Sequence, residues 1–167
     1  MQFRVMNRNT AKRYTYGPNC ILDCLIISIT DCGSVPNQFK SNPHIKGILR
    51  LEFDDVDFGE KNCITPEQGN KIVNFVTPRI NNIDLIIVHC EAGISRSAGI
   101  CAALMKIFTN DDSEIFDNPK YAPNMSCYRT VMNSYYGIIG SSLTEEDEQK
   151  WQHSIEVWKE ANPDDII

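Results

Sequence analysis

The hydrophobic positions of this sequence fall into short aliphatic runs separated by stretches with helical periodicity. Three runs are typical of β-strands: "ILDCLIISITD" (21–31), "HIKGILRLEFDD" (44–55) and "NNIDLIIVHC" (81–90). The first and third contain nearly continuous aliphatic stretches, which indicates strands buried on both faces, as in parallel sheets.

Helical signals lie between and after these runs. The segment 64–76 has Thr65 as a helix N-cap, Pro66 at the first helical position and Gln68 completing a capping box. The segment 97–108 is apolar almost all round, which predicts a buried helix. Strands that alternate with helices predict an α/β fold with a central, mostly parallel β-sheet flanked by helices on both faces.

The last third of the chain continues with helices. Residues 109–124 are predicted to be a polar connection, and 124–137 a helix that stops at Gly137. A final helix is expected within 141–163. It carries an apolar stripe of Trp151, Ile155 and Trp158. We expect this stripe to pack on the domain rather than to recruit a partner.

Composition and charge narrow the classes of function. The chain has 167 residues, 42% of them hydrophobic, and a net charge of −6. This length can bury a sizeable core, and no repeat or linker divides it, so residues 1–167 are predicted to form a single domain. The acidic charge argues against a nucleic-acid or membrane partner.

Targeting signals and cysteine usage predict a cytoplasmic protein. The longest apolar runs are too short for a membrane span, and the N-terminus lacks a signal-peptide core. Seven cysteines, an odd number, fit a reducing compartment better than a disulfide framework. No cysteine or histidine cluster has zinc-site spacing, so no metal and no cofactor are expected.

The strongest chemical signal is the stretch "HCEAGISRSAG" (89–99). A buried strand ends at Cys90, and a helix is expected to begin near Ser97. Such a junction directs backbone N–H groups and a helix N-terminus at one point, which makes an anion site and favours a thiolate over a thiol. Arg96 returns to the mouth of the loop, where its planar fork can bind two oxygens of a tetrahedral dianion.

The other loop residues have supporting roles in this interpretation. Gly93 allows a positive φ and a close approach of the backbone to the ligand. Ser97 is placed to hydrogen-bond the cysteine sulfur, and His89 is interpreted as a scaffold residue that holds loop carbonyls. The predicted substrate-binding residues are Glu91, Ala92, Gly93, Ile94, Ser95 and Arg96.

The pattern HC-x-x-G-x-x-R-S at 89–97 resembles the signature of the cysteine-dependent protein tyrosine phosphatase superfamily, and the chain is similar in size to its small dual-specificity members. The resemblance covers roughly residues 21–136. It implies the phosphatase fold and a metal-independent activity on phosphotyrosine, or also phosphoserine and phosphothreonine, through a phosphocysteine intermediate. A phosphorylated protein is then the expected partner.

The resemblance also implies an aspartic acid that protonates the leaving group from a loop upstream of the nucleophile. The stretch "LRLEFDDVDF" offers three candidates, of which we favour Asp55, then Asp57, then Asp54. Asn124, in the Pro-Asn pair before the 124–137 helix, is a candidate for positioning that loop or a water.

Other interpretations stay open. A catalytically idle phosphate-binding module would have the same fold, and members acting on phosphoinositides or RNA 5′-phosphates are alternatives. Glu91 and the lack of a base at the variable loop positions disfavour such highly charged substrates. Low-molecular-weight phosphatases and arsenate reductases share the Cys and Arg spacing but place the loop near the N-terminus. Cys63 and Cys101 are interpreted as structural fillers rather than redox partners of Cys90, and "NRNTAKRY" (7–14) as surface.

Overall fold

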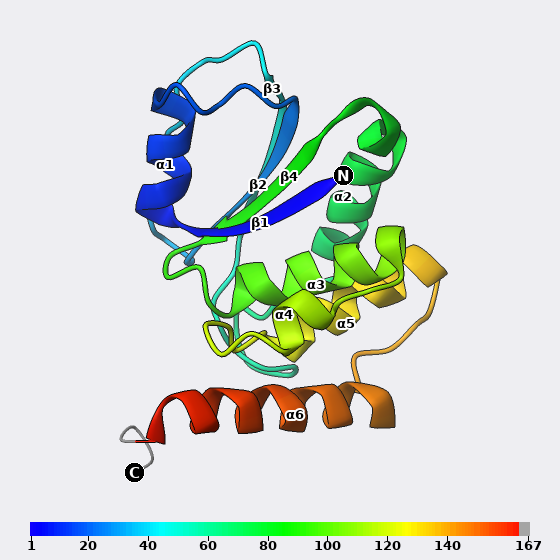
Figure 1. The fold of residues 1–167 in the computed structure, drawn as a ribbon. Coiled ribbons are helices and arrows are strands. Elements are labelled where there is room, and N and C mark those ends of the chain that lie inside the picture. Colours follow the sequence, from blue (N-terminus) through cyan, green and yellow to red (C-terminus); the bar gives the residue numbers. More distant parts are fainter. Residues whose placement is uncertain (164–167) are drawn as a thin grey trace.

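A computed structural model describes residues 1–163 of the chain (Figure 1). Its centre is a four-stranded sheet in the order β1-β4-β2-β3, and every pairing is parallel. The strands are β1 (Gln2–Asn7), β2 (Cys24–Thr30), β3 (Ile45–Glu52) and β4 (Leu85–Cys90). The prediction of an α/β fold with a parallel sheet is confirmed.

Helices cover both faces of this sheet. They are α1 (Arg8–Tyr16), α2 (Pro66–Val76), α3 (Arg96–Thr109), α4 (Ser113–Phe116), α5 (Met125–Tyr136) and α6 (Glu145–Ala161), with a 3-10 helix at Thr77–Asn82. Figure 1 shows α1 on one side of the sheet and α3, α4 and α5 on the other. The buried apolar side chains form two cores, a small one between the sheet and α1 and a large one between the sheet and the other helices.

Local sequence signals explain several element boundaries. Thr65 caps α2 and forms the predicted capping box with Gln68. Asn124 caps α5 by accepting from the backbone N–H of Cys127, and α5 ends at Gly137, which has a φ of 68°. The residues of the first helical turn and of the C-terminal stop therefore fix where these two helices begin and end.

The N-terminal segment corrects one prediction. Residues 7–14 are not simply surface, because they begin with the N-cap of α1 and include Ala11, which is buried in the smaller core. No strand had been expected at the start of the chain, yet β1 pairs along β4 with Asn7 opposite Cys90. The N-terminal strand therefore ends beside the signature loop.

A second correction concerns the connection 109–124. It contains the short helix α4, whose Ile115 and Phe116 are buried in the large core. Acidic and polar neighbours surround these two residues in the sequence, so the apolar pair was too short to produce a recognisable period.

Helices α3 and α5 approach each other closely at Gly99. A Cβ built at this glycine would lie 2.2 Å from the carbonyl oxygen of Asn124, closer than any real contact. Glycine is therefore required where α3 passes the start of α5, and the close approach brings Asn124 next to the signature loop.

The docking of α6 is largely polar. Arg129 on α5 forms an ion pair with Asp147, whose side chain is 2% exposed, and Lys150 forms one with Asp112. The apolar stripe is less covered than predicted, since Trp151 is 43% exposed and Ile155 and Trp158 are only half-buried. Ion pairs, rather than this stripe, carry much of the contact between α6 and the rest of the fold.

Within residues 1–163, no helix combines the length and the apolar character that crossing a bilayer demands.

Candidate active site

Cys90 is the last residue of the central strand β4, at the carboxyl edge of the sheet, and its side chain is buried. Two groups of the following turn contact its sulfur. The Ser97 Oγ lies 3.0 Å from Cys90 Sγ, and the backbone N–H of Gly93 donates to the same sulfur at 3.3 Å. The Gly93 N–H is thus directed at the sulfur, and the Ser97 hydroxyl lies within hydrogen-bonding distance of it.

The carbonyl groups of the loop face its neighbours. Three of their oxygens accept a hydrogen bond at 3.1 Å from a backbone N–H of another segment. The N–H of Arg8 donates to Glu91, that of Ala122 to Ile94, and that of Asn124 to Ser95. These pairings hold the loop backbone to its neighbours, and the N–H of Gly93 points at the sulfur.

No residue with a side chain fits at the position of Gly93. Its φ is 69°, and a Cβ there would lie 2.5 to 2.7 Å from backbone atoms of Met6 and Asn7 at the end of β1. The newly found strand β1 thus forms the wall on which the loop rests.

Arg96, the first residue of α3, is almost completely buried. Its Nη1 donates to the carbonyl oxygen of Phe53 at 2.7 Å and lies 2.6 Å from Asp31 Oδ1. Its Nε is buried and has no hydrogen-bond partner. A buried, unpartnered guanidinium nitrogen is costly unless a ligand completes it, and a tetrahedral oxyanion would do so.

Asp31 was missed as a site residue by the sequence interpretation, which placed it at the end of the first strand run, 21–31. It follows β2, and Arg96 follows the loop after the neighbouring strand β4. The signal that could have found it is its place at the carboxyl end of a parallel strand, where ligand sites of α/β proteins gather.

His89 lies within the sheet and is completely buried. Its Nε2 is 2.7 Å from Ser28 Oγ on β2, and its Nδ1 is 3.3 Å from the carbonyl oxygen of Cys90. Since a carbonyl only accepts, Nδ1 carries the hydrogen and Nε2 accepts from the serine hydroxyl. Burial lowers the pKa of His89 from 6.5 to about 4, so the ring is neutral at pH 7.

Asp55 lies against the signature loop. Its Oδ1 accepts hydrogen bonds from Ser95 Oγ at 2.8 Å and from Asn124 Nδ2 at 2.9 Å. Asn124 also donates to the carbonyl oxygen of Val56 at 3.2 Å. The structure therefore brings together the first-ranked acid, a loop residue and the predicted positioning residue.

The other two candidate acids have different surroundings. Asp54 accepts from the backbone N–H of Cys32 and from Asn62 Nδ2, and the hydrogen bond from Asn62 is the main cause that lowers the pKa of Asp54. Asp57 is exposed two residues beyond Asp55, and its backbone N–H donates to Glu60.

The variable positions of the loop form its outer surface. Glu91, Ala92 and Ile94 are exposed, and Ser95 is half-buried. Glu91 lies 3.4 Å from Arg8, whose other terminal nitrogen donates to the carbonyl oxygen of Val35. Arg8 thus links the signature loop to the segment after β2. No pattern in the sequence predicted these contacts of Arg8.

The remaining thiols near the core fit the interpretation as fillers. Cys101 and Cys127 are buried, and burial raises the pKa of both thiols. Burial is also the main cause that raises the pKa of half-buried Cys63. Within residues 1–163, no three histidine, cysteine or acidic side chains gather as a metal site would require.

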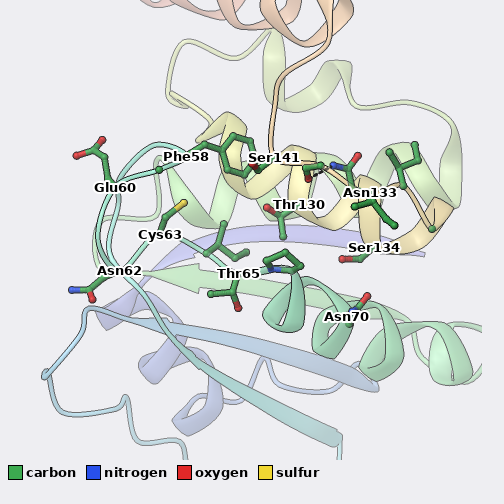
Figure 2. A pocket seen from close by; sticks show the side chains of 17 residues that line it. Phe58, Glu60, Asn62, Cys63, Thr65, Asn70, Thr130, Asn133, Ser134 and Ser141 are labelled. Atoms are coloured by element: carbon green, nitrogen blue, oxygen red, sulfur yellow. Dashed lines mark hydrogen bonds between the residues drawn. The ribbon is translucent and has the colours of Figure 1, made fainter.

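Two cavities lie beside the loop that carries Asp55. One, of about 800 Å³, includes Asp55, Ser95 and Asn124 in its wall and extends to Trp151 on α6. The other, of about 630 Å³, lies between the segment 58–66, α2 and α5 and is shown in Figure 2. Its lining is mostly apolar, and Glu60 is its charged residue, so it does not suit a phosphate group.

Fold and site together define an α/β protein with a buried cysteine and a buried arginine at a strand-to-helix junction. No family model and no curated protein matches the chain. Solved structures of dual-specificity and protein tyrosine phosphatases resemble it.

Three of these structures give the extent of the likeness. Human DUSP28 has 10% sequence identity and a TM-score of 0.49 over 97% of this chain and 94% of that one. PTPMT1 in complex with PI(5)P has 18% identity and a TM-score of 0.49 over 82% and 92%. DUSP15 has 20% identity and a TM-score of 0.45 over 92% and 90%. Identities and TM-scores this low leave the function to be argued from the geometry of the site.

Proposed function

We propose that this protein is a cysteine-dependent phosphatase that hydrolyses phosphate monoesters on proteins, phosphotyrosine first among them. The observation that carries the proposal is the buried Arg96 with its unpartnered Nε, beside a cysteine sulfur that accepts from Gly93 and contacts Ser97. A nucleophile and an oxyanion site at one strand-to-helix junction suit phosphoryl transfer.

In the first step the Cys90 thiolate attacks phosphorus. A sulfur–phosphorus bond forms, the bond from phosphorus to the ester oxygen breaks, and Asp55 gives its proton to the departing oxygen. Ser95 and Asn124 both donate to Oδ1 of Asp55, which reserves Oδ2 for that proton. Arg96 and the loop N–H groups hold the phosphoryl oxygens in place.

In the second step a water attacks the phosphocysteine. The Asp55 carboxylate takes a proton from that water, the sulfur–phosphorus bond breaks, and inorganic phosphate leaves. Cys90 departs as a thiolate, which Ser97 stabilises from 3.0 Å. Water and groups of this chain carry out both steps, so the reaction is expected to proceed without a cofactor.

A protein phosphomonoester is favoured over a more highly charged substrate by the surroundings of the loop. Glu91 is exposed on the loop itself, and Asp54, Asp55 and Asp57 lie on the neighbouring segment. A substrate with several phosphates would be repelled at this site, whereas a single phosphate is matched by Arg96 and the loop.

The test is hydrolysis of p-nitrophenyl phosphate in EDTA and reductant by the wild type, Cys90→Ser and Asp55→Asn. Cys90→Ser should lose activity, and Asp55→Asn should lose about 10²- to 10⁴-fold in kcat, as expected for a general acid. Cys32→Ser is the matched control, since Cys32 is an exposed thiol outside the signature loop.

Phosphotyrosine and phosphothreonine peptides measured in the same way rank the substrates. Activity that survives Cys90→Ser would refute the mechanism. A wild type that binds phosphopeptides without hydrolysing them would make the protein a phosphate-binding module instead.

A further inference from the structure

The guanidinium of Arg96 is held at one of its three nitrogens. Its side chain is 5% exposed, and Nη1 has two acceptors, the Phe53 carbonyl oxygen at 2.7 Å and Asp31 Oδ1 at 2.6 Å. An Nη nitrogen carries two hydrogens, so these two acceptors use both. The acceptors follow different strands, since Asp31 comes directly after β2 and Phe53 directly after β3.

This anchoring determines which donors remain for a ligand. A guanidinium is flat and rigid, so holding Nη1 from two directions fixes both the plane and the rotation of the group. The Nε, which is buried and unpartnered, and the adjacent Nη2 form the opposite edge. That edge has the two parallel donors that bind a tetrahedral oxyanion in a bidentate way.

We propose that Asp31 is a positioning residue that orients Arg96 for phosphate binding. The inference rests on the proposed function and extends it to a residue outside the signature. Without Asp31, the Phe53 carbonyl would hold Nη1 alone and the guanidinium could rotate away from the loop.

The two neighbouring carboxylates are engaged elsewhere. Asp54 accepts from the backbone N–H of Cys32 and from Asn62, and Asp55 accepts from Ser95 and Asn124. Asp31 is thus the carboxylate that contacts Arg96 within residues 1–163. Its own side chain is 46% exposed, so solvent screens its charge from an incoming phosphate.

Two effects of Asp31 can be separated by substitution. As a hydrogen-bond acceptor it orients Arg96, which strengthens oxyanion binding. As a negative charge it opposes the oxyanion, which weakens binding. Asp31→Asn keeps an acceptor oxygen and removes the charge, whereas Asp31→Ala removes both.

The experiment measures the Kd of tungstate, an oxyanion without a leaving group, by isothermal titration calorimetry of the full chain. Asp31→Ala should weaken binding about tenfold or more, the value of a hydrogen bond to a charged group, and Asp31→Asn should bind within about threefold of the wild type or tighter. The control is Glu52→Gln, whose carboxylate accepts from Gly33 in the same turn.

A kinetic arm tests that Asp31 acts through Arg96. Asp31→Ala should lower kcat/KM for p-nitrophenyl phosphate, but it should cause no further loss in an Arg96→Lys background. A general structural role would instead give additive losses and a lower urea midpoint for Asp31→Ala.

The outcomes separate this proposal from the proposed function. Unchanged tungstate affinity in Asp31→Ala, or equal shifts in Asp31→Ala and Asp31→Asn, would overturn the positioning role and leave the phosphatase activity standing. A wild type that binds tungstate in the expected order of variants but hydrolyses no ester would overturn the activity alone. A wild type that binds no tungstate would overturn both.

Discussion

His89 shows how a buried polar residue supports the site without touching a substrate. Its ring joins β4 to β2 through Ser28 and holds the carbonyl of Cys90 at the start of the loop. Both ring nitrogens are used by the neutral tautomer, so a second proton on the ring would leave Ser28 with no acceptor to bond and place a charge inside the sheet.

The lowered pKa of His89 predicts acid sensitivity of the fold. The unfolded chain takes up a proton near pH 6.5, but the folded protein does so only near pH 4. His89 therefore causes the free energy of unfolding to fall as the pH drops from about 6.5 to 4, by up to about 3 kcal/mol. Urea unfolding at pH 7 and pH 4.5 measures this loss.

His89→Gln should be less stable at pH 7 but should lose less stability between these two pH values. His153→Gln is the control, because His153 is exposed and pairs with Asp117 on the surface. Equal pH dependence of the wild type and His89→Gln would contradict the prediction.

Ser97 is predicted to act on the second chemical step. Removing its hydroxyl takes one hydrogen bond from the departing sulfur, which keeps that of the Gly93 N–H, so Ser97→Ala should lower kcat about tenfold to a hundredfold. Rapid-mixing kinetics should show a burst of p-nitrophenol followed by slow turnover. Ser154→Ala, which removes a buried hydroxyl on α6, should show neither change, and a Ser97→Ala variant without a burst would place the slow step elsewhere.

The residues of the signature were predictable from the sequence because nine adjacent positions contain them. Cys90, Arg96 and Ser97 are held by one turn and one helix start, so their relation follows from local geometry. The anchoring of Arg96 by Asp31 joins residues 65 positions apart in the chain, and no local pattern encodes it. It depends on the strand order, which the sequence did not determine.

At the scale of elements, the ion pair of Arg129 with buried Asp147 helps to hold α6 on α5. Asp147 completes the capping box of α6 with Thr144 and also pairs with Arg129 on α5. Arg129→Ala would leave the Asp147 carboxylate buried and unpaired. We therefore expect a loss of about 3–5 kcal/mol in the free energy of unfolding, measured in urea.

The matched control is Lys71→Ala, which breaks the exposed pair with Glu67 on α2. This change should alter the free energy of unfolding by less than about 1 kcal/mol. Similar losses in the two variants would mean that the Arg129 pair contributes no more than a surface contact.

Elements with strong periodicity or clear caps were predicted, and elements without them were missed. The strands β2 and β4 and the helix α2 have continuous aliphatic runs or a capping box. In contrast, β1 (Gln2–Asn7) alternates weakly and lies at an edge of the sheet, so half of its residues are polar or exposed. Its pairing with β4 is a long-range contact that creates the strand, which propensity alone does not reveal.

At the scale of the whole molecule, the distribution of charge predicts a preference among substrates. The protein has a net charge of −6, and exposed acidic side chains lie on the signature loop and on the segment that contacts it through Asp55: Asp55, Asp57, Glu60 and Glu91. Phosphopeptides with lysine or arginine beside the phosphorylated residue should therefore have a kcat/KM about tenfold above that of peptides with glutamate there.

The preference should shrink as the ionic strength rises, because salt screens exposed charges. Glu91→Gln with Glu60→Gln should reduce it at low salt, while hydrolysis of p-nitrophenyl phosphate stays near the wild-type rate. A preference for acidic peptides, or one that is insensitive to salt, would show that the acidic surface does not select the substrate.

The central claim is that Cys90 becomes covalently phosphorylated. The most direct measurement is acid quenching of the enzyme during turnover of p-nitrophenyl phosphate, followed by mass spectrometry of its peptides, with Asp55→Asn used to slow breakdown of the intermediate. We predict one phosphoryl group on the peptide that contains Cys90 and none in Cys90→Ser. A phosphoryl group on another residue, or active enzyme that forms no phosphoenzyme, would contradict this account.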